Sequence, residues 1–241
     1  MTERIKMLNF YVDSVDMDET ISRIEKIIEI GNPTQHVVVN ASKAVLLQKD
    51  QKLREIVNNC ELVNADGQSI VWASKFLGNS LPERVTGIDI MERLLQTSSK
   101  KGYKVYFFGA KEEVVKHYKK VYPSLEVVGY RNGYFELEDE SEIVRNISIS
   151  SADILLVGFS SPMKEYWLSK YNKQLNVPFQ MGVGGSFDII AGVTKRAPKW
   201  MQNVGLEWFY RFIQEPGRMG RRYFIGNLKF LFYTFKEKFS R

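Results

Sequence analysis

Lys104-Val-Tyr-Phe-Phe-Gly-Ala110 is the stretch that decides the fold, because an apolar run ends at a glycine and a charged helix is expected next, over residues 112–122. The same succession returns along the chain, with apolar strands predicted at 36–40, 125–130, 153–157 and 178–182. Strands that alternate with helices in this way are typical of parallel sheets. The sequence therefore predicts an α/β fold, a Rossmann-like parallel sheet flanked by helices, whose ligands bind beyond the carboxyl ends of the strands.

The composition of the 241-residue chain excludes several classes of protein. With 44% apolar residues and a net charge of +6, the chain is neither disordered nor of low complexity. A single cysteine, Cys60, excludes an internal disulfide, and two histidines, His36 and His117, are too few for a His-rich zinc site. No secretory signal is recognisable, and no apolar run approaches the roughly 20 residues of a membrane span. We therefore expect a cytoplasmic protein.

The carboxyl-terminal part of the chain is unusually basic and aromatic. Residues 195–241 hold 11 Lys and Arg against three Asp and Glu, together with 12 of the 31 aromatic residues. Helices are expected over 206–214 and after Gly226. The second would gather apolar residues on one face beside three lysines: Phe224, Leu228, Leu231, Phe235 and Phe239, with Lys229, Lys236 and Lys238. Such a segment suits an anionic membrane surface, nucleic acid or a phosphorylated ligand. We divide the chain into an α/β body, residues 1–195, and a helical appendage, residues 196–241.

Two acidic motifs are candidates for chemistry. Asp66, in Asn64-Ala-Asp-Gly67, follows an apolar stretch and could act as a general base, although an Asp-Gly pair also makes a simple turn, which the residues alone favour. Asp16-Met-Asp18 resembles the metal-binding Asp-x-Asp of sugar transferases. It precedes an apolar-periodic helix, however, where acidic caps are expected.

Glycines at three predicted strand exits favour a nucleotide ligand. They are Gly109, Gly158 and the pair Gly184 and Gly185, and such loops let backbone N–H groups approach a diphosphate. The full dinucleotide fingerprint is absent, which argues against a dehydrogenase. Arginine forks match phosphate oxygens, and several occur late in the chain: Arg196, Arg211, Arg218, Arg221 and Arg222. The same arginines could instead rest on anionic lipid or RNA.

Taken in order, these motifs resemble the WecG/TagA/CpsF family of glycosyltransferases, glycosyltransferase family 26, over nearly the whole chain. The residues that carry the resemblance are Asn40, Ala65-Asp-Gly67, Pro82-Glu-Arg84-Val-Thr-Gly-Ile-Asp89, Phe108-Gly-Ala110, Asn132-Gly-Tyr-Phe135, Val157-Gly-Phe-Ser-Ser-Pro162-Met-Lys164-Glu165-Tyr-Trp167, Gly182-Val-Gly-Gly-Ser-Phe-Asp188, Gly192, Arg196-Ala-Pro198, Leu206-Glu-Trp-Phe-Tyr-Arg211 and Glu215-Pro216, with Arg221-Arg222-Tyr223.

The resemblance implies an inverting transferase that needs neither metal nor cofactor and works as a peripheral protein on the cytoplasmic face of the membrane. Its donor would be a UDP-sugar, UDP-N-acetylmannosamine or a relative. Its acceptor would be undecaprenyl-diphosphate-linked N-acetylglucosamine, in cell-surface polysaccharide or teichoic acid synthesis. Asp66 matches the family's proposed general base, which replaces the turn interpretation. Asn40 and Arg84 match pocket positions, and the arginines of the appendage match a segment that closes over the diphosphate. Lys164, Glu165 and Asp188 fall in motifs expected to bind substrate.

Two departures from the family pattern affect the donor. Val38 stands where a threonine is frequent, and Pro162-Met-Lys-Glu165 stands where Pro-Lys-Gln-Glu is usual. UDP-glucose, UDP-galactose and the uronic acid of N-acetylmannosamine therefore remain alternative donors. A soluble transferase with a non-lipid acceptor and a non-enzymatic nucleotide- or RNA-binding protein with a basic arm are the rival functions. We expect the donor, the lipid-linked acceptor and an anionic membrane surface as partners, without nucleic acid, and the aromatic tail leaves a homo-oligomer open.

Overall fold

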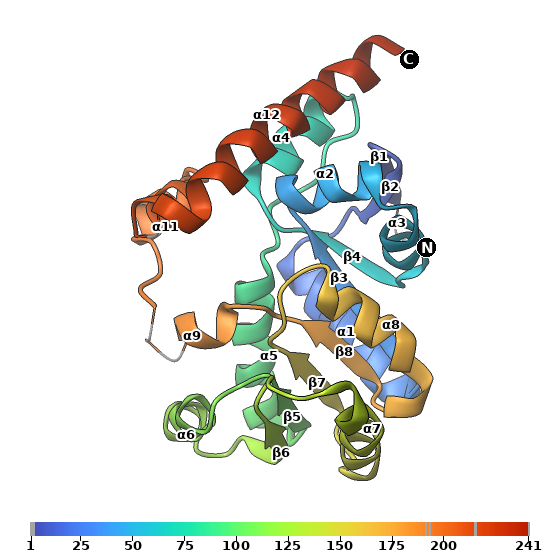
Figure 1. The fold of residues 1–241 in the computed structure, drawn as a ribbon, viewed down its shortest axis with the longest axis vertical. Helices are drawn as coiled ribbons and strands as arrows, with labels where there is room; N and C mark the ends of the chain where they lie inside the picture. The colour runs from blue at the N-terminus through green and yellow to red at the C-terminus, as the bar shows by residue number, and fades with distance from the viewer. Residues whose placement is uncertain (1–2, 191, 193, 215, 241) are drawn as a thin grey trace.

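The computed structural model describes residues 3–190, 192, 194–214 and 216–240, without the side chains of residues 188, 190, 203, 211, 216 and 218–224. Its central sheet has six parallel strands, in the order β4 (Leu62–Ala65), β3 (Thr34–Val39), β8 (Phe179–Gly182), β7 (Ile154–Val157), β5 (Lys104–Phe108) and β6 (Glu126–Arg131). Helices cover both faces of this sheet (Figure 1). The predicted Rossmann-like α/β fold is confirmed.

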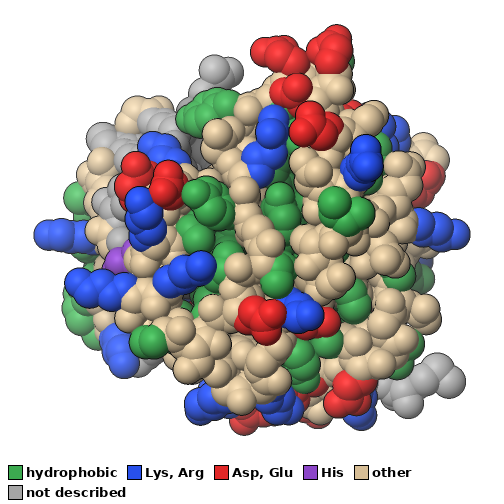
Figure 2. Space-filling view, turned by 90° about the horizontal axis from the view of Figure 1, so that it is seen from below, with side chains coloured by type: hydrophobic (Ala, Val, Ile, Leu, Met, Phe, Trp, Pro, Cys, Tyr) green, Lys and Arg blue, Asp and Glu red, His purple; other side chains and the backbone are tan. Residues whose placement is uncertain are grey.

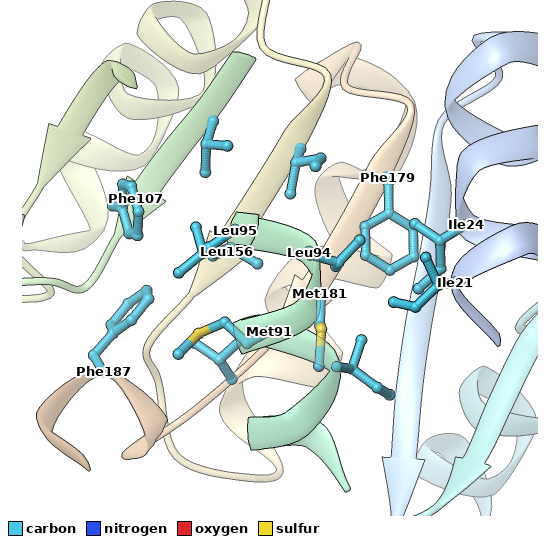
Figure 3. Packing of buried hydrophobic residues seen from close by; sticks show 14 of the residues in the cluster. Ile21, Ile24, Met91, Leu94, Leu95, Phe107, Leu156, Phe179, Met181 and Phe187 are labelled. Carbon is cyan, nitrogen blue, oxygen red and sulfur yellow. The ribbon is translucent and has the colours of Figure 1, made fainter. Parts of the chain in front are cut away.

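Alternate residues of the strands point to opposite faces of the sheet, so each face carries its own apolar core. On one face, the side chains of Phe107, Leu156 and Met181 meet residues from α1 and α5 (Figure 3). The helices on this face are α1 (Met17–Ile30), α5 (Gly87–Lys101) and α6 (Glu112–Val121). On the other face lie α2 (Ala41–Lys49), α3 (Gln51–Asn59), α7 (Glu140–Ile149), which follows the short helix η1 (Leu137–Asp139), and α8 (Met163–Leu175).

Acidic residues act as helix caps at two places. The carboxylate of Asp16 accepts the N–H of Glu19 at 2.8 Å, and Glu19 accepts the N–H of Asp16 at 3.0 Å, which makes a capping box for α1. The cap interpretation of Asp16-Met-Asp18 is therefore confirmed. Sequence periodicity also favours one helix over residues 43–59, and this is wrong, because α2 ends and α3 begins at Asp50, which caps α3 through the N–H of Leu53 at 3.0 Å.

Three helices form the appendage: α10 (Lys199–Asn203), α11 (Glu207–Gln214) and α12 (Pro216–Ser240). The last of these lies across α2, next to α4 (Gln68–Phe76) and the hairpin of β1 (Arg4–Met7) and β2 (Phe10–Asp13) (Figure 1). The predicted start after Gly226 is wrong, since α12 runs through this residue. A Cβ atom at Gly226 would lie 3.5 Å from Ser42 Oγ, so the glycine lets α12 approach α2 closely.

Contacts along its length fix α12 to the body. Phe230 is buried in the same apolar cluster as residues of α2, and the carboxylate of Glu237 accepts the N–H of Leu8 at 2.5 Å. Within the described ranges, no helix combines the length and the hydropathy that crossing a bilayer requires. The end of the molecule opposite α12, seen from below in Figure 2, carries basic and acidic side chains interspersed with apolar ones.

Candidate active site

Asp66 and Asn40 lie side by side where the neighbouring strands β4 and β3 end. The N–H of Asp66 donates to the carbonyl oxygen of Val39 at 2.8 Å, and a Cβ atom at Gly67 would lie 3.7 Å from Asn40 Cβ. Asn40 also caps α2, because its Oδ1 accepts the N–H of Lys43 at 3.1 Å. The Asp66 carboxylate is half-buried. A carboxylate in this position has the access that a general base needs and a fixed backbone beneath it.

Arg84 belongs to the same group. The N–H of Val85 donates to the carbonyl oxygen of Ala65 at 3.0 Å, which holds the segment containing Arg84 against the residue that precedes Asp66. The Arg84 guanidinium is largely buried, and its Nη1 lies 3.6 Å from Oε2 of Glu207 on α11. The structure thus brings Asp66, Asn40 and Arg84 together and adds a residue of the appendage to them.

Arg196 lies at the junction of body and appendage, held by carboxylates. Its Nη2 is 2.7 Å from Asp89 Oδ1 on α5, and its Nε donates to Glu207 Oε1 at 3.2 Å. Burial alone would lower the pKa of Arg196, but Asp89 and Glu207 outweigh it and raise the pKa above its usual value. These contacts fix the start of the appendage, and the predicted contact between Arg196 and substrate stays a prediction.

The glycines at the strand exits differ in what surrounds them. A Cβ atom at Gly109 would lie 3.0 Å from the backbone nitrogen of Gly158, and one at Gly158 would lie 2.8 Å from the Phe187 ring. Close packing of the β5 and β7 exits therefore already explains these two glycines. A Cβ atom at Gly184, where φ is +56°, would lie 3.6 Å from Lys164 Nζ, whereas one at Gly185 would meet open space. Gly185 has the most room for a ligand.

Glu165 is enclosed in the body. Its carboxylate accepts hydrogen bonds from Lys43 Nζ at 2.6 Å and from Ser161 Oγ at 2.9 Å. Burial would raise the pKa of Glu165, but Lys43 and Lys164 together lower it below its usual value. The neighbouring Lys164 donates to the carbonyl oxygen of Gly182 at 2.9 Å, at the exit of β8. Glu165 thus contacts α2 and Lys164 contacts the β8 exit, and sequence motifs gave no sign of Lys43, the partner of Glu165.

The surroundings of His36, Cys60 and His117 give none of them a role in the site. Burial lowers the pKa of His36 to about 4, so that its ring is neutral, and its Nε2 lies 2.8 Å from Asn64 Oδ1. Burial raises the pKa of the Cys60 thiol to about 12, which makes it a poor nucleophile. His117 lies half-exposed on α6. Among the described residues, no three His, Cys, Asp or Glu side chains gather where they could hold a metal ion.

Five predicted site residues have side chains outside the described part of the structure. Asp188 is on α9 (Ser186–Ile190), Arg211 is on α11, and three further arginines are on α12: Arg218, Arg221 and Arg222. The proposed contacts of the arginines with the diphosphate, and of Asp188 with substrate, stay predictions.

The appendage reaches the site at points that sequence motifs did not single out as functional. A Cβ atom at Gly205 would lie 2.6 Å from Gln68 Cβ, two residues after Asp66, and Gly226 packs on Ser42, two residues after Asn40. The ion pair between Glu207 and Arg84 is a third contact between the appendage and the site. The appendage therefore covers both strand exits that present the candidate base.

Comparison with known proteins shows the family to which the chain belongs. The sequence model of the family described as "Glycosyl transferase WecG/TagA/CpsF family" matches residues 5–241. A Bacillus subtilis protein named N-acetylglucosaminyldiphosphoundecaprenol N-acetyl-beta-D-mannosaminyltransferase is 32% identical over 187 residues, 76% of this chain and 72% of that protein. Proteins of the same name from Bacillus spizizenii and Staphylococcus aureus are each 29% identical, over 91% of this chain and 86% and 88% of their own lengths. The chain belongs to the WecG/TagA/CpsF family of glycosyltransferases.

Proposed function

We propose that this protein transfers N-acetylmannosamine from a UDP-sugar to undecaprenyl-diphosphate-linked N-acetylglucosamine, in the synthesis of teichoic acid or another cell-surface polysaccharide. The observation that carries the proposal is the half-buried carboxylate of Asp66 beside Asn40 and Arg84 at the strand exits, under the appendage. The names of relatives that align with 76–91% of the chain supply the sugar and the acceptor.

In the proposed reaction, Asp66 removes the proton from the acceptor hydroxyl. The hydroxyl oxygen attacks the anomeric carbon from the face opposite UDP, a new glycosidic bond forms, and the bond between that carbon and the diphosphate oxygen breaks. The configuration at the anomeric carbon is therefore inverted. UDP leaves with the electron pair of the broken bond, and cationic side chains stabilise its developing charge.

Arginines are our candidates for that charge stabilisation, in place of a metal ion or another cofactor. Arg84 precedes Val85, whose N–H is bonded to Ala65 beside Asp66, and the other arginines follow its partner Glu207 in the appendage: Arg211, Arg218, Arg221 and Arg222. Gly185, with open space around it, and Lys164, at the β8 exit, are the proposed contacts on the donor side. Glu165 acts indirectly, because its carboxylate is held by Lys43 and Ser161.

A peripheral position on the cytoplasmic membrane face fits the surface of α12. Its outward side chains are large and apolar: Leu228, Leu231, Phe232, Phe235 and Phe239 are 50–82% exposed. They share one side of the helix, opposite the buried Phe230 and Thr234, and Lys229, Lys236 and Lys238 flank them. An apolar stripe bordered by lysines is the arrangement of helices that lie in the interface of an anionic membrane.

The body adds two aromatic residues to this surface. Trp72 and Phe76, one turn apart on α4, are 60% and 41% exposed, and the Phe76 ring centroid lies 5.2 Å from that of Phe235. Lys238 Nζ lies 5.6 Å from the centre of the Phe76 ring. We name Trp72, Phe76 and the five outward residues of α12 the lipid-facing surface. Because α4 begins two residues after Asp66, this surface would set the distance between the candidate base and the bilayer.

The test is a panel of UDP-sugars offered with a short-chain polyprenyl-diphosphate-linked N-acetylglucosamine and read by mass spectrometry. We expect a product that is heavier by one N-acetylhexosamine, formed from UDP-N-acetylmannosamine. A product from UDP-glucose, UDP-galactose or the uronic acid donor alone would reassign the donor, and Val38 and Lys164 would then be the first residues to examine. Absence of any product, together with salt-sensitive RNA binding, would favour the nucleic-acid-binding alternative.

A further inference from the structure

We propose that Glu207 is a positioning residue for Arg84, whose guanidinium it holds in the orientation that substrate binding requires. This inference rests on the proposed function and extends it to a residue that does not touch substrate. Glu207 is the first residue of α11, and its side chain is only 13% exposed. Its carboxylate joins three elements: α11, the loop before α5, and the start of the appendage.

Arg196 determines where the Glu207 carboxylate lies. One Glu207 oxygen, Oε1, accepts the Nε–H of Arg196 at 3.2 Å, and Arg196 is itself anchored to Asp89 on α5 at 2.7 Å. The second oxygen, Oε2, is then directed to Arg84, whose Nη1 lies 3.6 Å away. Asp89 on α5 thus fixes Arg196, Arg196 fixes the Glu207 carboxylate, and Glu207 in turn fixes the guanidinium of Arg84.

The segment that contains Glu207 also contacts the other side of the Asp66 loop. Gly205, where φ is +76°, packs so closely on Gln68 that a Cβ atom would come within 2.6 Å of Gln68 Cβ. Val85, next to Arg84, is bonded to the carbonyl oxygen of Ala65 on the near side of Asp66. Residues 205–207 therefore contact the Asp66 loop on both sides of the candidate base. Gly205 packs on Gln68, which follows Asp66, and Glu207 pairs with Arg84, whose neighbour Val85 is bonded to Ala65, which precedes Asp66.

A guanidinium on a long flexible stem needs such a partner to keep one orientation. Arg84 and Glu207 are 16% and 13% exposed, so their interaction is screened less than a surface ion pair. Without the carboxylate, Arg84 would sample other rotamers, and small misplacements of groups that bind substrate are costly in rate. An alternative is that Glu207 occupies the place of a donor phosphate and competes with it. The two hypotheses predict opposite changes in the affinity for UDP.

The experiment compares Glu207→Gln with Glu126→Gln, which removes the same charge from an exposed position on β6. We expect Glu207→Gln to lower kcat/KM by up to about 10²-fold, and to weaken UDP binding measured by calorimetry without acceptor, while Glu126→Gln changes neither. Unchanged kcat/KM and UDP affinity in Glu207→Gln would overturn the proposal, and so would tighter UDP binding, which the competing-anion hypothesis predicts.

A double-mutant cycle separates positioning from a general loss of docking. In an Arg84→Gln background, Glu207→Gln should cause little further loss in UDP affinity, because the group through which it acts is already gone. Equal losses in both backgrounds would contradict the inference. If the unmodified protein transfers sugar and only these comparisons fail, the positioning role is wrong and the proposed function stands. If the unmodified protein makes no product, the proposed function fails, whereas the UDP affinities still test Glu207.

Discussion

The backbone N–H of Asp66 donates to the carbonyl oxygen of Val39 at 2.8 Å, across the gap between the ends of β4 and β3. This bond places the candidate base directly next to Asn40, which follows Val39 in the chain. Because the bond uses only backbone atoms, the side chain at position 66 can be changed without disturbing it. The base can therefore be tested apart from the fold.

Asp66→Asn should abolish most transfer and leave stability nearly unchanged. An amide has the shape of the carboxylate but cannot accept a proton, and general base catalysis typically contributes about 10²–10⁴-fold. The measurement is the initial rate of transfer to the lipid-linked acceptor, with thermal unfolding as the control for folding. Transfer at a near-normal rate would show that another group takes the proton.

Gly205→Ala should reduce transfer more than its effect on backbone strain explains. Gly31→Ala is the matched control, since Gly31 has φ +79° against +76° at Gly205, but a Cβ atom there would meet nothing within 4 Å. Both variants should lose about 1 kcal/mol of unfolding free energy through left-handed backbone strain. Only Gly205→Ala should also displace Glu207 from Arg84 and slow transfer. Equal activities would mean that the contact with Gln68 has no part in the reaction.

Trp72→Ala should weaken binding to vesicles that contain phosphatidylglycerol by about tenfold, the effect of removing one large apolar side chain that the bilayer would bury. Tyr134→Ala is the control, because Tyr134 is 81% exposed but follows β6, at the opposite edge of the sheet from β4. Co-sedimentation at two salt concentrations would measure both, and binding by both proteins should weaken at high salt because lysines contribute. If the two variants bind alike, α4 does not belong to the lipid-facing surface.

Acidification should destabilise the protein through His36. Burial lowers the pKa of His36 to about 4 in the native state, against 6.5 in the unfolded chain. Between these values the unfolded chain binds more protons, so the unfolding free energy falls as pH decreases from 6.5 towards 4. The His36 contribution to this fall amounts to about 2 kcal/mol by pH 5. His36→Gln should flatten this part of the pH profile in urea unfolding, whereas His117→Gln should keep it. A profile that is unchanged in His36→Gln would assign the dependence to other groups.

Local patterns were sufficient to predict most of the sheet, because a strand followed by a glycine and a helix is encoded in contiguous residues. The resemblance to the family assigned Asp66 and Asn40 to the site, and the parallel pairing of β3 and β4 explains why the two residues are neighbours. The hairpin of β1 and β2 was not predicted, as its short strands lack a long apolar run. The break at Asp50 was also missed, because the helical pattern continues on both sides of this residue and no glycine or proline marks the break.

Pairings between distant residues could not be obtained in this way. The guanidinium of Arg196 suits a phosphate and a carboxylate equally well, and only the fold shows that Asp89 and Glu207 lie against it. Glu207 and Arg84 are far apart in sequence, and neither carries a local signal of the other. Lys43 is similar, since its buried partner Glu165 comes from a helix much later in the chain.

The burial of Phe230, on the side of α12 that faces α2, has a practical consequence for anyone who prepares this protein. Truncation before α12 would remove the exposed apolar residues of this helix, but it would also expose the apolar residues of α2 that Phe230 covers. The shortened protein would therefore still have an exposed apolar surface. Replacing outward side chains such as Phe232 and Phe239 with polar ones should improve solubility and leave the packing of α12 on α2 unchanged.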